Sequence, residues 1–285
     1  MGNRMIYKTE KGRIAVQNAY NNMLSRWPVA YEQHFINTCL GHTFVLQSGE
    51  KQNPPVILLH GSGSNSAMWM TTVKELCNTH CVYCIDIPGE PGKSAENQLT
   101  IASKAYTDWL DDILKGLALP SAAFVGISLG GHLSAAFAIR FPQKVSQLVL
   151  LNPSGFGKQR ASFMLKALPL MLLGKPGRFV IAHSLYGDVM PPKSAIHYTT
   201  SIARHFKPRL EKIPLFKSKE MSKLTMPVLC ILGEKDVMLY TEQTERRLNT
   251  LLPNAEVKMI PGAGHALIHI AKDIAYFLNH SVQAK

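Results

Sequence analysis

The amino-acid sequence predicts a doubly wound α/β fold with a mostly parallel sheet of about eight strands and an inserted helical cap. Short apolar runs at residues 56–59, 80–87 and 122–127 lack the alternation of a half-exposed strand. Such runs are typical of strands buried on both faces of a parallel sheet. Stretches of helical length and spacing at 66–76 and 100–117 separate them. This alternation is the pattern of right-handed βαβ crossovers.

The segments before and after these runs extend the same pattern. Residues 10–27 carry apolar side chains at helical spacing and are closed by Pro28, which predicts a helix ahead of the sheet. Residues 34–40 and 42–48 flank a glycine and are expected to pair as an antiparallel hairpin. Further buried strands are expected at 145–151, 228–232 and 255–260, and further helices at 132–140 and from Ala266 onward.

Proline residues break this regular alternation between residues 153 and 225. A chain of 285 residues that is 46% hydrophobic suits one domain carrying an insertion. We therefore predict an N-terminal helical extension at 1–30, a core made of 31–154 and 223–285, and a helical cap or lid at 155–222.

The predicted cap is strongly basic. It holds twelve Lys or Arg residues against three acids, a net charge of +9, and these are interleaved with apolar residues. This composition favours a substrate with an apolar acyl part and an anionic group, or weak peripheral contact with acidic lipid. The alternative is that the Lys and Arg side chains only form a solvated face.

Composition excludes several other classes of protein. Five cysteines are an odd number for a disulfide framework, and Cys81 and Cys84 lie in an apolar run that predicts core positions rather than a metal site. The N-terminus has no signal-peptide pattern, and the longest apolar stretch, 161–173, is too short to span a membrane. No nucleic-acid motif accompanies the net charge of +12. We expect a cytoplasmic protein without a nucleic-acid partner or a transmembrane segment.

A G-x-S-x-G sequence centred on Ser128 is the first candidate for catalysis. It lies between the apolar run 123–127 and the helical run 132–140, as a nucleophile elbow requires. Gly126 and Gly130 leave room for a tight turn that lifts the serine hydroxyl out of the sheet. The following helix directs its N-terminus toward any negative charge that forms there.

Residues 60–64, with the sequence His-Gly-Ser-Gly-Ser, follow the predicted strand 56–59. Such a loop can direct backbone N–H groups toward the serine hydroxyl, so we expect an oxyanion hole made by the amides of Ser62 and Leu129. A phosphate-binding loop is excluded because no Lys-Ser/Thr pair follows the glycines.

An acidic residue follows the predicted strand 228–232. Asp236 is the expected catalytic acid and Glu234 is its rival, because ligands and catalytic groups gather at the carboxyl ends of strands in open α/β sheets.

His265 is the expected general base. It lies in a glycine-containing loop after the predicted strand 255–260, and its near-neutral pKa suits proton transfer. The other histidines considered are assigned structural roles: His269 on a helix body, His132 one turn after Ser128, and His60 orienting the oxyanion loop.

The chain order Ser128, Asp236, His265 and the motifs around these residues resemble the α/β-hydrolase superfamily, in the broad group of bacterial carboxylesterase-like proteins with a helical cap. The resemblance extends from about residue 34 to the C-terminus and implies the fold, the triad and the oxyanion donors. The segment 86–94 is one residue longer than the superfamily's Asp-x-x-Gly-x-Gly-x-Ser. A serine nucleophile argues against haloalkane dehalogenases and epoxide hydrolases, which carry aspartate there.

We therefore expect hydrolysis of a small-molecule carboxylic ester through an acyl-enzyme, with no metal or organic cofactor. Ester cleavage leads because an alkoxide leaves more easily than an amine. Thioester, amide, lactone and carbon–carbon hydrolysis stay open, as does a ligand sensor with slow turnover.

Overall fold

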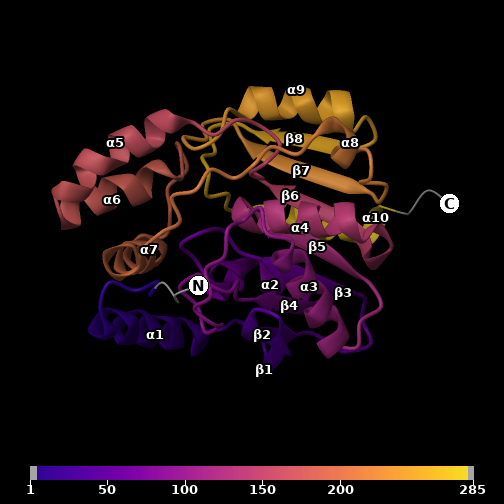
Figure 1. The fold of residues 1–285 in the computed structure, drawn as a ribbon, viewed down its shortest axis with the longest axis horizontal. Coiled ribbons are helices and arrows are strands. Elements are labelled where there is room, and N and C mark those ends of the chain that lie inside the picture. Colours follow the sequence, from indigo (N-terminus) through magenta and orange to yellow (C-terminus); the bar gives the residue numbers. More distant parts are fainter. Residues whose placement is uncertain (1–4, 282–285) are drawn as a thin grey trace.

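An eight-stranded sheet forms the centre of the molecule (Figure 1). The structure is a computed structural model that describes residues 5–281. From one edge of the sheet to the other, the strands are β1 (Tyr31–Thr38), β2 (Gly41–Ser48), β4 (Cys81–Ile85), β3 (Pro55–Leu59), β5 (Ala122–Ile127), β6 (Val145–Leu151), β7 (Val228–Gly233) and β8 (Glu256–Ile260).

The pairing of the strands confirms the predicted doubly wound, mostly parallel sheet. β1 pairs with β2, and β2 with β4, in antiparallel register, whereas the remaining strands are parallel. The prediction that β8 is fully buried is wrong. β8 is an edge strand with β7 on one side only, and its Glu256 and Lys258 are exposed.

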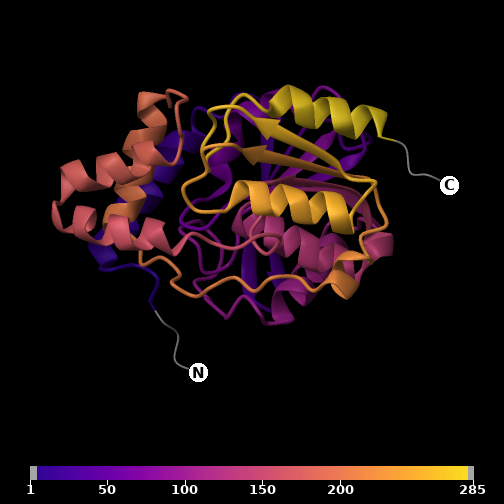
Figure 2. The ribbon, with the colours of Figure 1, turned by 90° about the horizontal axis from the view of Figure 1, so that it is seen from above.

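Helices cover both faces of the sheet, and each face has its own apolar core (Figures 1 and 2). One core contains side chains of α3, α4 and α9, and the other contains side chains of α1, α2 and α10. The helices are α1 (Glu10–Leu24), α2 (Met70–Leu76), α3 (Ala105–Gly116), α4 (Leu129–Arg140), α5 (Ala161–Leu172), α6 (Lys175–Ser184), α7 (Lys193–His205), α8 (Ser218–Met221), α9 (Thr241–Leu251) and α10 (Ala271–His280).

One predicted helix begins later than the sequence indicates. The segment expected to be helical from Ala266 onward enters α10 only at Ala271, so His269 does not lie on a helix body and has a φ of 61°. The amide of Ala266 donates to Leu185 O at 2.8 Å, and the carbonyl of His265 accepts from Asn152 at 2.9 Å. These tertiary hydrogen bonds hold the backbone in a non-helical path.

Of the helices between β6 and β7, α5, α6 and α7 lie to one side of the sheet (Figures 1 and 2), whereas α8 packs into a core of the sheet through Met221. α7 packs against α1, and the two backbones beside this contact are joined: Lys8 N donates to His205 O at 2.8 Å and Lys207 N to Ile6 O at 2.7 Å. After α7 the chain returns along the core, where Phe216 is buried. No helix within residues 5–281 is long and apolar enough to cross a membrane.

His132 gives the fold a defined response to acid. Its side chain on α4 is buried and stacks on Phe216 with ring centroids 4.6 Å apart. Burial disfavours the imidazolium and lowers the pKa of His132 to about 4. In the unfolded chain the imidazole binds a proton near pH 6.5. Between that pH and about 4 only the unfolded state is protonated, so the free energy of unfolding falls as the pH falls through this range.

We expect His132→Gln to lose less stability on acidification than the wild type. Between pH 7.5 and 4.5 the difference should be about 2 to 3 kcal/mol in the free energy of unfolding. Urea unfolding at the two pH values measures it. His197→Gln, which removes an exposed imidazole on α7, is the control and should behave as the wild type does. If His132→Gln and the wild type lost the same free energy of unfolding between the two pH values, His132 would not be the source of this acid response.

Candidate active site

Ser128 lies at the end of β5, in a backbone conformation that few residues adopt. Its φ is 52° and its ψ is −110°, and α4 begins at the next residue. A Cβ on Gly130 would overlap the carbonyl oxygen of Leu59, and a Cβ on Gly126 would overlap the carbonyl of Gly130. Both positions therefore require glycine. The sharp turn exposes the serine side chain at the N-terminus of α4, where the helix dipole favours negative charge.

His265 and Asp236 form a buried hydrogen-bonded pair. His265 Nδ1 lies 2.7 Å from Asp236 Oδ2. The other carboxylate oxygen accepts from the amides of Met238 at 2.6 Å and Leu239 at 3.0 Å. With Oδ1 held in this way, Oδ2 is left to accept the N–H of His265. That bond directs the other ring nitrogen, Nε2, away from the acid.

The rival acid has a different partner. Glu234 is exposed, and its carboxylate accepts from the amide of Gly262 at 2.8 Å. In this structure Asp236, and not Glu234, contacts His265.

Asn152, which the sequence analysis did not single out, joins the two loops that carry this pair. Its side-chain amide donates to the carbonyls of Gly264 at 3.0 Å and His265 at 2.9 Å, and its side-chain oxygen accepts from Gly233 N at 2.8 Å. The residue is fully buried at the end of β6. The sequence feature that could have identified Asn152 is its position directly after a buried strand, because functional groups in open α/β sheets gather at the carboxyl ends of strands.

The loop after β3 lies against Ser128. A Cβ on Gly61 would be 3.7 Å from Ser128 Cβ. His60 Nε2 accepts from the amide of Ile87 at 2.9 Å, so Nδ1 carries the proton and donates to Gly61 O at 2.8 Å. Burial lowers the pKa of His60, which keeps the ring neutral in this role. His60 therefore orients the loop.

The amides of Leu129 and Ser62, the two predicted oxyanion donors, have no acceptor within the part of the chain that the structure describes. Leu129 is fully buried, Ser62 is exposed, and neither N–H donates to any group within residues 5–281. Leu129 begins α4, so its N–H is one of the first-turn amides that a helix leaves without an intrahelical partner, and it can donate to a bound group.

The hydroxyl of Ser128 makes no hydrogen bond within the described part of the chain. Its backbone connects it to the rest of the site, because Ser128 N donates to Leu151 O at 2.9 Å and Ser128 O accepts from Ser154 N at 3.2 Å. The structure thus joins His265 to Asp236 directly, and Ser128 to them through the end of β6.

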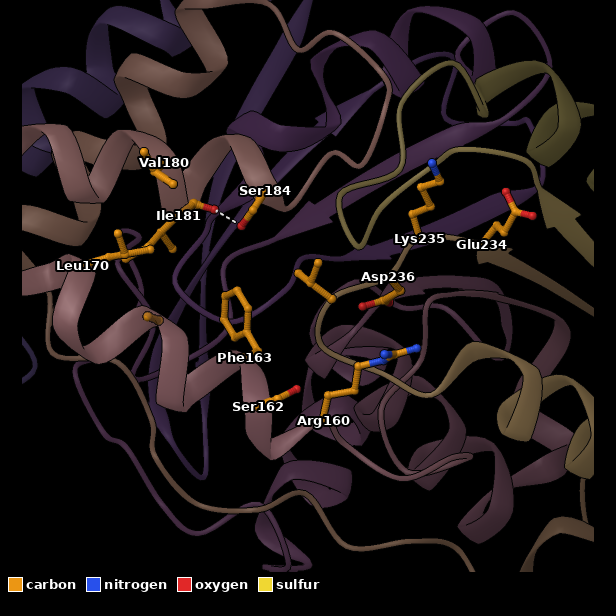
Figure 3. Close-up of a pocket in the computed structure, with 12 residues that line it drawn as sticks. Arg160, Ser162, Phe163, Leu170, Val180, Ile181, Ser184, Glu234, Lys235 and Asp236 are labelled. Atoms are coloured by element: carbon orange, nitrogen blue, oxygen red, sulfur yellow. Dashed lines mark hydrogen bonds between the residues drawn. The ribbon is translucent and has the colours of Figure 1, made fainter.

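A cavity of 390 Å³ opens between α5, α6 and the loop after β7 (Figure 3). Apolar side chains of the two helices form much of its wall, and Asp236 lies on the opposite side. Polar groups are also present in the lining, among them Arg160 and Lys235. Its apolar residues include Phe163, Ala167, Leu170, Val180 and Ile181.

No cluster of three or more His, Cys, Asp or Glu side chains arranged to hold a metal ion occurs between residues 5 and 281. Cys81 and Cys84 lie buried in β4 with free thiols.

The sequence matches the alpha/beta hydrolase family over residues 56–275, and the chain belongs to that family. It is 28% identical over 261 residues to the uncharacterized carboxylesterase nap of Bacillus subtilis (strain 168), covering 89% of this chain and 87% of that protein. It is also 28% identical over 273 residues to carboxylesterase YbfK of the same organism, covering 92% and 91%.

Two crystal structures share the whole architecture. Carboxylesterase CesB (YbfK) from Bacillus subtilis superimposes with a TM-score of 0.85 at 26% identity, over 95% of this chain and 100% of that one. Naproxen esterase (carboxylesterase NP) from Bacillus subtilis gives 0.82 at 26% identity, over 95% and 97%. Within its family the chain is therefore carboxylesterase-like.

Proposed function

We propose that this protein is a serine hydrolase that cleaves carboxylic esters through an acyl-enzyme, with Ser128, His265 and Asp236 as its catalytic triad. The observation that carries the proposal is the buried His265–Asp236 hydrogen bond at 2.7 Å. Like the strained turn at Ser128, it lies where parallel strands of the sheet have their carboxyl ends. The likeness to two carboxylesterases over about nine tenths of each chain supports it.

Each member of the triad has a role that follows from its contacts. Ser128 Oγ attacks the acyl carbonyl while His265 Nε2 accepts its proton and then gives it to the leaving alcohol. Asp236 holds the tautomer in which Nδ1 carries hydrogen and stabilises the imidazolium. Water then attacks the acyl-enzyme, with His265 again as base. The Ser128–His265 hydrogen bond forms with substrate, since such bonds are often long in unliganded enzymes.

The amides of Ser62 and Leu129 are the proposed oxyanion donors. Leu129 directly follows Ser128, Ser62 follows Gly61, which lies against Ser128, and neither amide has an acceptor within residues 5–281. Hydrogen bonds from two such donors become stronger as negative charge develops on the carbonyl oxygen. They therefore stabilise the transition state and lower the barrier to acyl transfer.

The cavity indicates the kind of ester. Its apolar wall from α5 and α6 suits an apolar acyl part, and its lining includes Asp236 of the proposed triad but neither Ser128 nor His265. Helices α5 to α7 would act as the cap over this space. The same residues could instead hydrolyse a thioester, an amide, a lactone or a carbon–carbon bond. Esters are preferred because an alkoxide leaves easily and requires the least protonation by His265.

A second candidate function is contact of the α5–α6 turn with an acidic lipid surface. Leu172 and Leu173 are 84% and 63% exposed at this turn, with Lys175 beside them. Residues 155–187 contain no acidic residue. Exposed apolar side chains next to basic ones suit the boundary of an anionic membrane.

Ser128→Ala should abolish ester hydrolysis. Removing a triad nucleophile costs roughly 10⁴-fold or more in kcat. Initial rates on p-nitrophenyl esters from acetate to long acyl chains, with labelling by a fluorophosphonate probe, measure it. Ser134→Ala, a buried serine on α4 nearly two turns after Ser128, is the control and should keep its activity. A wild type inactive on every ester and unlabelled by the probe would contradict the proposal and favour a ligand sensor.

Ala167→Trp should shift the preferred acyl chain toward shorter esters, because the indole would fill the apolar part of the cavity. Leu165→Trp, on the exposed side of the same helix, is the matched control and should leave the optimum in place. The p-nitrophenyl ester series reports kcat/KM for each chain length. An unchanged optimum in Ala167→Trp would exclude this cavity as the acyl site.

Binding to phosphatidylglycerol vesicles should exceed binding to phosphatidylcholine vesicles and should weaken with salt. In sedimentation, Ser128→Ala should bind as the wild type does and Leu172→Asp should bind much less. Tyr276→Asp, an exposed aromatic residue on α10, controls for added charge. Equal sedimentation of Leu172→Asp and wild type would exclude the α5–α6 turn as the contact.

A further inference from the structure

A buried ion pair joins the segment after α7 to the loop after β4. Arg209 Nε donates to Glu90 Oε1 at 2.7 Å, and the two side chains are 6% and 0% exposed. The remaining guanidinium nitrogens donate to Leu99 O at 2.5 Å and to the hydroxyl of Tyr106. The arginine is thus bonded through all three nitrogens to groups of the core.

The second oxygen of Glu90 holds the loop after β3. Glu90 Oε2 accepts from Gly63 N at 2.7 Å and from Ser62 Oγ at 3.3 Å. On the other side of Ser62, the carbonyl of Gly61 is held by His60 Nδ1. The Gly61–Ser62 peptide, which carries the Ser62 amide, is therefore held through its own carbonyl and through the amide of the following peptide, and Gly61 lies against Ser128.

Stability alone does not account for this pair. Taking two charges out of water costs about as much as their attraction returns, so a buried ion pair is weak evidence for a stabilising role. A lone carboxylate at this place would also oppose negative charge forming beside Ser62 N–H, because charges interact strongly away from water. Arg209 neutralises it without removing the acceptor for Gly63 N.

We propose that Glu90 and Arg209 are positioning residues for the oxyanion hole: Glu90 anchors the Ser62–Gly63 turn so that Ser62 N–H faces the reacting carbonyl, and Arg209 cancels the charge of the anchor. The inference rests on the proposed serine-hydrolase function. It assigns a catalytic purpose to the stretch between α7 and α8, which supplies the cation.

The test compares Arg209→Met, Glu90→Gln/Arg209→Met and Glu90→Ala/Arg209→Met, with kcat and KM for p-nitrophenyl butyrate normalised to the folded fraction. Arg209→Met should lower kcat by about 10- to 100-fold with little change in KM, a loss of transition-state stabilisation. The Gln double variant should recover at least part of kcat, since Gln accepts from Gly63 N without charge. The Ala double variant should not recover, because it has no acceptor.

Arg140→Met, which removes the cation of the partly exposed Arg140–Asp108 pair, is the matched control and should keep the wild-type kcat. The double variants carry no unpaired buried carboxylate, so they keep the test decisive if Arg209→Met fails to fold. A wild-type kcat in folded Arg209→Met, or a Gln double variant no faster than the Ala one, would overturn the inference. Failure of the underlying function is seen separately, in a Ser128→Ala enzyme that stays active.

Discussion

The backbone of Ser128 is the constraint on which the arrangement of the site depends. A non-glycine residue at a φ of 52° is strained, and it persists only where its surroundings fix it. Ser128 N donates to Leu151 O, and Ser128 O accepts from both His132 N and Ser154 N. The glycines beside it let α4 approach the end of β3 closely. These contacts hold the ends of β3, β5 and β6 close together around Ser128, and they fix where the loops after these strands begin.

Buried polar side chains then fix the loops that the apolar cores cannot reach. Asp86 accepts from Tyr20 and from the amides of Ser66 and Lys93, Asn152 bridges the loops of Asp236 and His265, and Glu90 links two further segments. Each of these groups is satisfied by partners from different parts of the chain. A fully satisfied buried network is rigid, whereas a half-satisfied one is costly, so these residues turn flexible connections into a defined site.

The sequence predicts most of the sheet because buried parallel strands produce unbroken apolar runs. β5 and β6 occupy the predicted residues, and β3, β4 and β7 differ at their ends by one or two. The exposure of β8 was not predicted, since its edge position depends on the strand order. The late start of α10 was missed because the amide of Ala266 is engaged by Leu185, a partner far away in the sequence.

In the candidate site, too, some residues could be predicted from the sequence and others could not. Ser128, Asp236 and His265 stand in local motifs beside strand ends, where the pattern of glycines and apolar residues identifies them. Arg209 has no such pattern: it is one of many basic residues in its segment, and its partner Glu90 is 119 positions away. The extra residue in the segment 86–94 was the only local sign that the loop around Glu90 differs.

The contact between α1 and α7 joins the N-terminal helix to the helices between β6 and β7. Lys8 and Lys207 tie the two backbones, and a side chain on Gly12 would collide with His205. Tyr20 also donates to Asp86, so α1 is fastened to the core at its other end. α7 is therefore linked to the core through α1. The N-terminal helix thus supports a helix that follows it in the chain by more than 150 residues.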